Sequence, residues 1–359
     1  MDLVIINPYN FFTRFLGHKK CLWHPQAPQG VDASLLMGFK RVADPFAGGF
    51  GGRCPPRRSV DMRTDLAVES VYDHHGGGTI EDYEDIGNLR VTRIKITTKE
   101  AALEIGKPMG NYITLEGSSI SKKEPEILES VSTVLSAELR KILPSGVDNI
   151  LVVGLGNRQI TPDALGPDVI EKIMVTNHII KFLNTDNQKD FSKVSGISPG
   201  VMGITGMETV DIIKGIVDVA KPSLVIAVDA LCAHSASRMF KTIQITDTGI
   251  NPGSGVGNRR DGLNKESLNV PVIAIGIPTV VDAASIVVDA LSDFFKRNDN
   301  MENSSEIIND ILGNSEAGLI VSPKDIDNLI ERGAKMIANG INLALHDNID
   351  FAFIESFVS

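Results

Sequence analysis

Two uninterrupted apolar segments constrain the fold of this chain more than any other feature. They are Ile150–Val153 and Leu224–Val228, and both are short and rich in branched side chains. Between them, residues 208–220 place apolar side chains at helical spacing, and Pro222 ends that helix. A strand, a helix and a second buried strand form a βαβ unit, in which the strands are parallel. The sequence therefore predicts an α/β fold, with a mostly parallel, twisted sheet and helices on both faces.

The alternation of strands and helices extends through most of the chain. Leu89–Ile96 alternates apolar and polar residues as a half-buried strand does, and a second strand is expected around Asn111–Leu115, so an antiparallel or mixed portion precedes the parallel part. The other expected elements are a helix over 128–142, a strand at Val272–Ile275 with a helix beyond Thr279, a polar surface loop with some helix from Lys296 to Glu316, and a final helix that opens at Ser322–Asp325 with a capping-box-like start and runs to about Leu345.

Residues 1–61 differ from the rest of the chain in composition. They contain Trp23, two of the three cysteines and the Gly/Pro-rich run Pro45–Pro56, and they show no sustained helical or strand period. We interpret this segment as a loosely ordered extension.

Composition and charge exclude several classes of function. The 359 residues carry a net charge of −10, which opposes binding to nucleic-acid phosphates. The longest apolar stretch, Val270–Leu291, is broken by prolines and aspartates and predicts strand, turn and helix rather than a membrane span. The N-terminus lacks a basic leader and a sustained apolar core, so no secretory signal is expected. Cys21, Cys54 and Cys232 form no Cys-x-x-Cys pair, which predicts a reducing, cytoplasmic compartment without disulfides.

Two carboxylates follow the apolar segments. Asp163 comes a short loop after Ile150–Val153, and Asp229 comes directly after Leu224–Val228. Because ligands collect beyond the carboxyl ends of parallel strands, we expect both side chains to face one cleft. Peptide hydrolysis needs a carboxylate that deprotonates water and a neutral carboxyl that polarises the carbonyl or protonates the leaving nitrogen. Two close carboxyls divide these roles, because the first charge raises the pKa of the second. The pair predicts a two-carboxylate hydrolase, although each aspartate taken singly fits a helix cap or a turn.

Other candidate motifs are weaker. Gly154-Leu-Gly156 follows a strand, as in dinucleotide-binding proteins, but Pro162 stands where the helix would already run, so a tight strand-to-helix turn is the better interpretation. Cys232 and His234 have poor spacing for a nucleophile and its base. His74-His75 are adjacent, which disfavours one shared metal ion. The Gly-rich stretch 251–260 lacks the Gly-Lys-Ser/Thr of a phosphate loop and equally fits a flexible loop that contacts substrate.

Several long motifs occur in order along the chain, and together they resemble one family. They are Arg63-Thr-Asp-Leu-Ala-Val-Glu69, Gly154-Leu-Gly-Asn-Arg-Gln-Ile-Thr-Pro-Asp-Ala-Leu-Gly166, Pro199-Gly-Val-Met-Gly-Ile-Thr-Gly-Met-Glu208, Val228-Asp-Ala-Leu231, Asp247-Thr-Gly-Ile-Asn-Pro-Gly-Ser-Gly-Val-Gly-Asn258 and Gly276-Ile-Pro-Thr-Val-Val-Asp-Ala283. From about Arg63 to the C-terminal helix, the chain resembles the germination protease (GPR endopeptidase) of spore-forming bacteria.

This resemblance implies a fold, an activity and a biological setting. It implies a fold similar to that of the hydrogenase-maturation peptidases (phosphorylase/hydrolase-like), and a homotetrameric peptidase of the forespore or spore core. Its substrates would be small acid-soluble spore proteins, cut after Glu and before an apolar residue. Asp163 and Asp229 match the family's catalytic pair, and whether the mechanism is atypical aspartic-type or metal-assisted is left open. We expect no cofactor, and we assign no metal ligand.

The same resemblance implies an inactive precursor that cuts itself between Asp65 and Leu66. The chain then divides into an N-terminal extension and prosegment, residues 1–65, and a single catalytic domain, residues 66–359. Because family prosegments are usually short and residues 1–61 match no family pattern, Met62 is a candidate initiator.

The expected site extends beyond the two aspartates, and two other functions stay open. We expect Asn157, Thr161, Arg238 and Thr279 to bind substrate or line the cleft. The alternatives are a hydrogenase-maturation-like peptidase and a non-catalytic, nucleotide-binding α/β protein.

Overall fold

The computed structural model describes residues 3–6, 64–72, 76–180, 191–251, 262–297 and 319–358. Within these residues one sheet has the strand order β2-β3-β4-β8-β9-β7-β5-β6, and β10 joins β9 to β1. The strands are β1 (Leu3–Ile6), β2 (Thr79–Ile86), β3 (Leu89–Ile96), β4 (Gly110–Glu116), β5 (Asn149–Gly154), β6 (Lys193–Ile197), β7 (Leu224–Ala233), β8 (Thr242–Thr246), β9 (Val272–Asp282) and β10 (Ile320–Pro323).

The sheet has a parallel half and an antiparallel half. Strands β6, β5, β7 and β9 are parallel, whereas β2, β3, β4 and β8 pair antiparallel and join the other half through β9. The predicted mixed α/β sheet is confirmed. β5, β7 and β9 are buried, almost continuous apolar runs, as strands covered on both faces must be.

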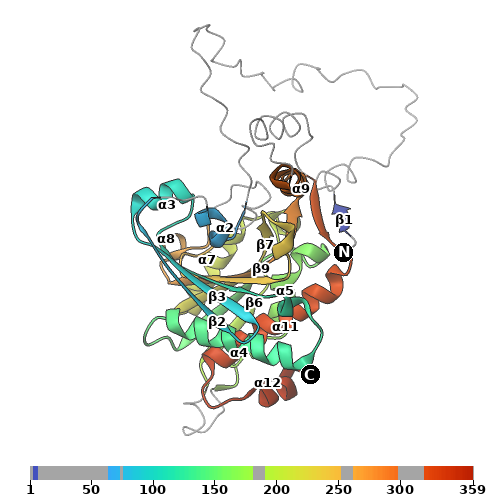
Figure 1. Ribbon diagram of the computed structural model, residues 1–359. Coiled ribbons are helices and arrows are strands. Elements are labelled where there is room, and N and C mark those ends of the chain that lie inside the picture. The colour runs from blue at the N-terminus through green and yellow to red at the C-terminus, as the bar shows by residue number, and fades with distance from the viewer. Residues whose placement is uncertain are drawn as a thin grey trace, which may run out of the picture. The chain divides into compact units, whose positions relative to one another are not determined.

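Helices cover both faces of the parallel half. Ile150, Val152 and Ile226 belong to the larger apolar core, which also takes in α4 (Pro125–Ile142), α5 (Leu165–Ile170) and α11 (Ile326–Leu345). Figure 1 shows α4 and α11 running together on this side of the sheet. The alternate residues of the same strands, such as Leu151 and Val225, pack on the other face against α7 (Thr209–Ala220) and α8 (Lys265–Leu268).

Five further helices of the described residues lie outside these two layers. They are α2 (Ala67–Tyr72), α3 (Lys99–Ile105), α6 (Met202–Thr205), α9 (Ala283–Arg297) and α12 (Phe351–Val358). No helix among the described residues is both long enough and apolar enough to cross a membrane.

The start of the helix that we expected to run to about Leu345, which is α11, was predicted wrongly. Ser322 and Pro323 belong to β10, and the helix begins only at Ile326, without a side-chain cap from Asp325. Val321 pairs with Val281 at the far end of β9, so sheet pairing overrides the local capping pattern. Strand β1 lies in the extension for which we predicted no regular structure. The expected loop at 296–316 falls mostly outside the described residues.

Candidate active site

Three glycines bring the turn after β5 against the sheet. A Cβ atom on Gly154 would lie 2.2 Å from the carbonyl oxygen of Gly166, and one on Gly156 would lie 2.1 Å from that of Asp163. Gly156 also has a φ of +114°, which side chains rarely adopt. The Gly-x-Gly spacing is thus explained by close packing of the chain around Asp163.

Asp163 is held by main-chain and side-chain contacts of this turn. It lies in the 3₁₀ helix η3 (Thr161–Asp163), and its Oδ2 accepts a hydrogen bond of 2.8 Å from the N–H of Asn157. The hydroxyl of Thr279, on β9, donates to the carbonyl of Pro162 at 2.7 Å. Thr161 is half-buried. Asn157 and Thr279 are buried, and through these hydrogen bonds they support the turn.

Asp229 lies just beyond the point where β7 loses its pairing with β5. Strand β5 stops with Gly154 opposite Val228, whereas β7 continues to Ala233, so Asp229 lies inside its strand rather than at its end. Its side chain is 6% exposed, and Oδ1 accepts from the N–H of Ala230 at 2.9 Å. Burial raises the pKa of Asp229 well above its ordinary value, and the charge of Asp163 raises it further. Two nearby carboxyls with one retained proton can act as acid and base.

The predicted self-cleavage site packs against strand β7, which carries Asp229. The N–H of Asp65 donates to the carbonyl of Cys232 at 2.9 Å, and the N–H of Cys232 donates to Oδ2 of Asp65 at 2.8 Å. Leu66 is completely buried against Leu231 and other apolar side chains. The charge of Asp65 also contributes to the raised pKa of Asp229, after burial and the charge of Asp163.

Gln244 on β8 holds both sides of this peptide bond. Its Nε2 donates to the carbonyl oxygen of Asp65 at 3.0 Å, and its Oε1 accepts from the N–H of Ala67 at 2.6 Å. No sequence motif singled out this residue, since it alternates with apolar residues in a short strand.

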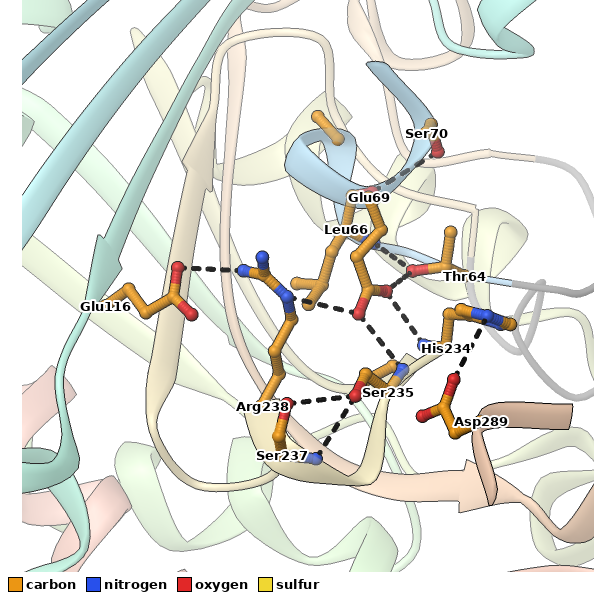
Figure 2. A network of polar contacts seen from close by, with 12 residues as sticks. Thr64, Leu66, Glu69, Ser70, Glu116, His234, Ser235, Ser237, Arg238 and Asp289 are labelled. Atoms are coloured by element: carbon orange, nitrogen blue, oxygen red, sulfur yellow. Dashed lines mark hydrogen bonds and ion pairs between the residues drawn. The ribbon is translucent and has the colours of Figure 1, made fainter. Parts of the chain in front are cut away.

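Glu69, in the first turn of α2, anchors the segment after the bond (Figure 2). Its carboxylate accepts hydrogen bonds from the N–H groups of His234 (2.8 Å) and Ser235 (3.1 Å), and it also accepts from the hydroxyl of Thr64. Nε of Arg238 lies 3.4 Å from the same carboxylate. The predicted cleft residue Arg238 therefore contacts the chain's own segment.

Two further charged side chains, Glu116 and Lys107, extend this network. Arg238 also donates to Glu116 at 2.9 Å, as Figure 2 shows. On the other side, Nζ of Lys107 donates to the carbonyl of Thr64 at 2.9 Å. Burial lowers the pKa of Lys107, whereas the charges of Asp65 and Glu69 act in the opposite direction.

The cysteine alternative has no support in the geometry. Burial, together with the nearby carboxylate of Asp65, raises the pKa of the Cys232 thiol to about 12, so little thiolate is present at neutral pH. Nε2 of His234 lies 3.9 Å from Oδ1 of Asp289. His74, His75 and the Gly-rich loop at 252–260 lie outside the described residues, as do Cys21 and Cys54. Among the described residues, no group of three or more His, Cys, Asp or Glu side chains is arranged to hold a metal ion.

Comparisons with known proteins agree on one family. The family model for germination protease matches residues 59–303 and 297–358. A germination protease of Clostridium tetani is 40% identical over 326 residues, which cover 84% of this chain and 100% of that protein. One from Caldanaerobacter subterraneus is 42% identical, covering 81% and 96%. One from Bacillus subtilis is 38% identical, covering 80% and 94%.

A similar solved structure is that of a [NiFe] hydrogenase maturation protease, HycI, from Thermococcus kodakarensis. It is 21% identical with a TM-score of 0.30, and the match covers 57% of this chain and 98% of HycI. The family match spans both aspartates and the Asp65–Leu66 bond, and these relatives cover most of the sequence. The chain belongs to the germination protease family.

Proposed function

We propose that this chain is an endopeptidase of spore germination that is made as a precursor, cuts its own Asp65–Leu66 bond, and then degrades small acid-soluble spore proteins. Family membership supports the class of activity. The observation that carries the self-cleavage is the position of the bond. Asp65 pairs with Cys232 on the strand that carries Asp229, and its charge acts on that carboxyl.

The proposed chemistry uses Asp163 and Asp229 as a pair. The ionised carboxylate takes a proton from a water molecule, whose oxygen adds to the carbonyl carbon of residue 65. The protonated carboxyl then gives its proton to the nitrogen of residue 66 as the C–N bond breaks. Because burial raises the pKa of Asp229, we assign it the retained proton and assign Asp163 the role of base.

The proposed setting follows from the family resemblance. We propose a homotetramer in the cytoplasm of the forespore or spore core, with no cofactor. The division of the chain at residue 65 belongs to the same proposal.

The test is N-terminal sequencing of the purified full-length chain after incubation between mildly acidic and neutral pH. We expect a new terminus at Leu66. The reaction should accelerate on acidification, since a doubly ionised pair gains the required proton as the pH falls. The Asp163→Asn precursor should not process itself. A terminus elsewhere, or normal processing of that variant, would show that the bond or the catalyst is misassigned.

A second experiment tests the substrate and the mechanism. The processed protein is incubated with a small acid-soluble spore protein, with and without a chelator. Cleavage that survives the chelator supports the two-aspartate mechanism, whereas cleavage abolished by the chelator and restored by metal supports metal assistance. An intact spore protein in both samples, despite self-cleavage, would contradict the proposed substrate.

A further inference from the structure

The side-chain amide of Gln244 is aimed at the carbonyl group of the Asp65–Leu66 bond. The Ala67 N–H can only donate and the Asp65 carbonyl can only accept, so the two contacts together fix which end of the amide faces which group. Gln244 is 6% exposed, so water competes little for these hydrogen bonds. The NH₂ group is thus a fixed donor, 3.0 Å from the oxygen of the bond that the chain is proposed to cut.

Sheet register places Gln244 in one row with Asp229. On β9, Gly276 is opposite Gln244 of β8 and also opposite Asp229 of β7. Residues that are opposite each other in register project from the same face of a sheet. Both side chains therefore rise from one face, about 10 Å apart at two strand spacings.

Gly276 adds no side chain between them. A Cβ atom there would lie 2.7 Å from the carbonyl oxygen of Asp229 and 2.6 Å from Cγ of Leu231, the residue that packs against Leu66. This glycine keeps the surface below the peptide segment free of a further side chain.

We propose that the Gln244 amide binds the carbonyl oxygen of the bond being cut and stabilises the negative charge that forms on it when water adds. The inference rests on the proposed self-cleavage and extends to protein substrates that occupy the same place. Peptide-bond hydrolysis needs a donor at this oxygen, and removing one such donor typically lowers kcat by ~10²–10³-fold. With Gln244 at the oxygen, the proton on the aspartate pair is left for the departing nitrogen.

The experiment compares Gln244→Glu with Gln244→Leu in the full-length chain. Glutamate keeps the oxygen that accepts from Ala67 but loses the donor, whereas leucine loses both. We expect Gln244→Glu to slow self-cleavage by ~10²-fold or more at neutral pH. Relative to the wild type at the same pH, its rate should recover in part on acidification, because a protonated carboxyl can donate again. Gln244→Leu should be slow at every pH.

A peptide that copies residues 60–72 separates catalysis from binding. Each variant is first processed to the mature form, by added wild-type protein if it does not cut itself. With the peptide as substrate, its kcat should fall while its KM changes by less than ~3-fold. Thr242→Val is the matched control, since Thr242 is buried two residues away in the same strand and its hydroxyl has no hydrogen-bond partner among the described residues. Circular dichroism confirms that each variant is folded.

The outcomes distinguish this inference from the proposed function. If the wild-type chain cuts neither its own bond nor the peptide, the proposed function is wrong and this inference falls with it. If the wild type cuts while both Gln244 variants match its kcat within ~3-fold, or if the whole loss lies in KM, the role of Gln244 is overturned.

Discussion

Replacing Asp229 by asparagine is expected to abolish cleavage and, at the same time, to stabilise the folded chain at neutral pH. Asparagine keeps the size of the side chain but can neither hold nor transfer the proton, so the rate should fall by at least ~10²-fold. The stabilisation follows from burial. The side chain is 6% exposed, and its charge is opposed first by desolvation and then by the charges of Asp163 and Asp65.

The sign of the pH dependence follows from the raised pKa of Asp229. In the unfolded chain this pKa returns to about 3.9, so the folded state holds the proton more tightly. The free energy of unfolding of the wild type therefore contains a contribution that is present below pH 4. It is lost as the pH rises through the folded pKa. Asparagine does not titrate, so the difference in the free energy of unfolding between variant and wild type increases as the pH rises through this range.

At pH 7 we expect Asp229→Asn to raise the free energy of unfolding by about 1–3 kcal/mol, the size of a typical desolvation cost, because the variant carries no buried charge. Urea unfolding at pH 4 and pH 7 measures the difference, and processing of the precursor measures activity. Asp218→Asn, on the exposed face of α7, is the control and should change stability by less than about 0.5 kcal/mol. A variant that is less stable at pH 7, a difference independent of pH, or near-wild-type cleavage would refute the reasoning.

Three further changes test neighbouring parts of the structure. Cys232→Ser should retain peptide turnover, and iodoacetamide should not inhibit the wild type, because the thiol pKa is about 12. Burial lowers the pKa of His346 to about 4, so the contribution of His346 to the free energy of unfolding should fall by about 3 kcal/mol between pH 6.5 and pH 4. Urea unfolding of His346→Phe should lack this loss. Arg238→Gln should slow self-cleavage by ~3–10-fold, measured as appearance of the Leu66 terminus, because the carboxylate of Glu69 keeps only its neutral donors. An unchanged rate would remove Arg238 from the docking of the segment.

Periodicity predicted elements of both halves of the sheet, because each of them is buried by its own apolar pattern. Leu89–Ile96 is the strand β3 with unchanged bounds, and the helix over 208–220 differs from α7 by one residue. The same reasoning missed β2, whose residues are mostly exposed and half of them acidic, so they show no apolar alternation. That strand exists because Thr79–Ile86 pairs with β3 along its whole length.

The candidate site was predictable only for residues whose chemistry and position after an apolar segment indicated the same role. Asp163 follows strand β5, and Asp229 follows the apolar residues Leu224–Val228 within strand β7. The charge of Asp163 contributes to the raised pKa of Asp229. Gln244 and Glu69 could not be assigned in this way. Their partners lie 179 and 165 residues away in sequence, and only strand register and the docking of α2 bring them together.

One strand and the residues directly after it supply both the proposed chemistry and the hold on the chain's own segment. Asp229 lies on β7, the N–H of Cys232 pairs with Asp65, and the N–H groups of His234 and Ser235 bind Glu69. Under the proposed function, a protein substrate is cut by the same carboxyls and has to lie across the same surface. The segment from Asp65 to Glu69 therefore competes with any substrate for as long as it stays docked. Under the proposed function, cutting Asp65–Leu66 removes the covalent link to the Asp65–Cys232 contact. The segment that follows the bond is then held only by the contacts of Leu66, Ala67 and Glu69. Self-cleavage therefore both activates the enzyme and weakens the binding of the segment that covers the site.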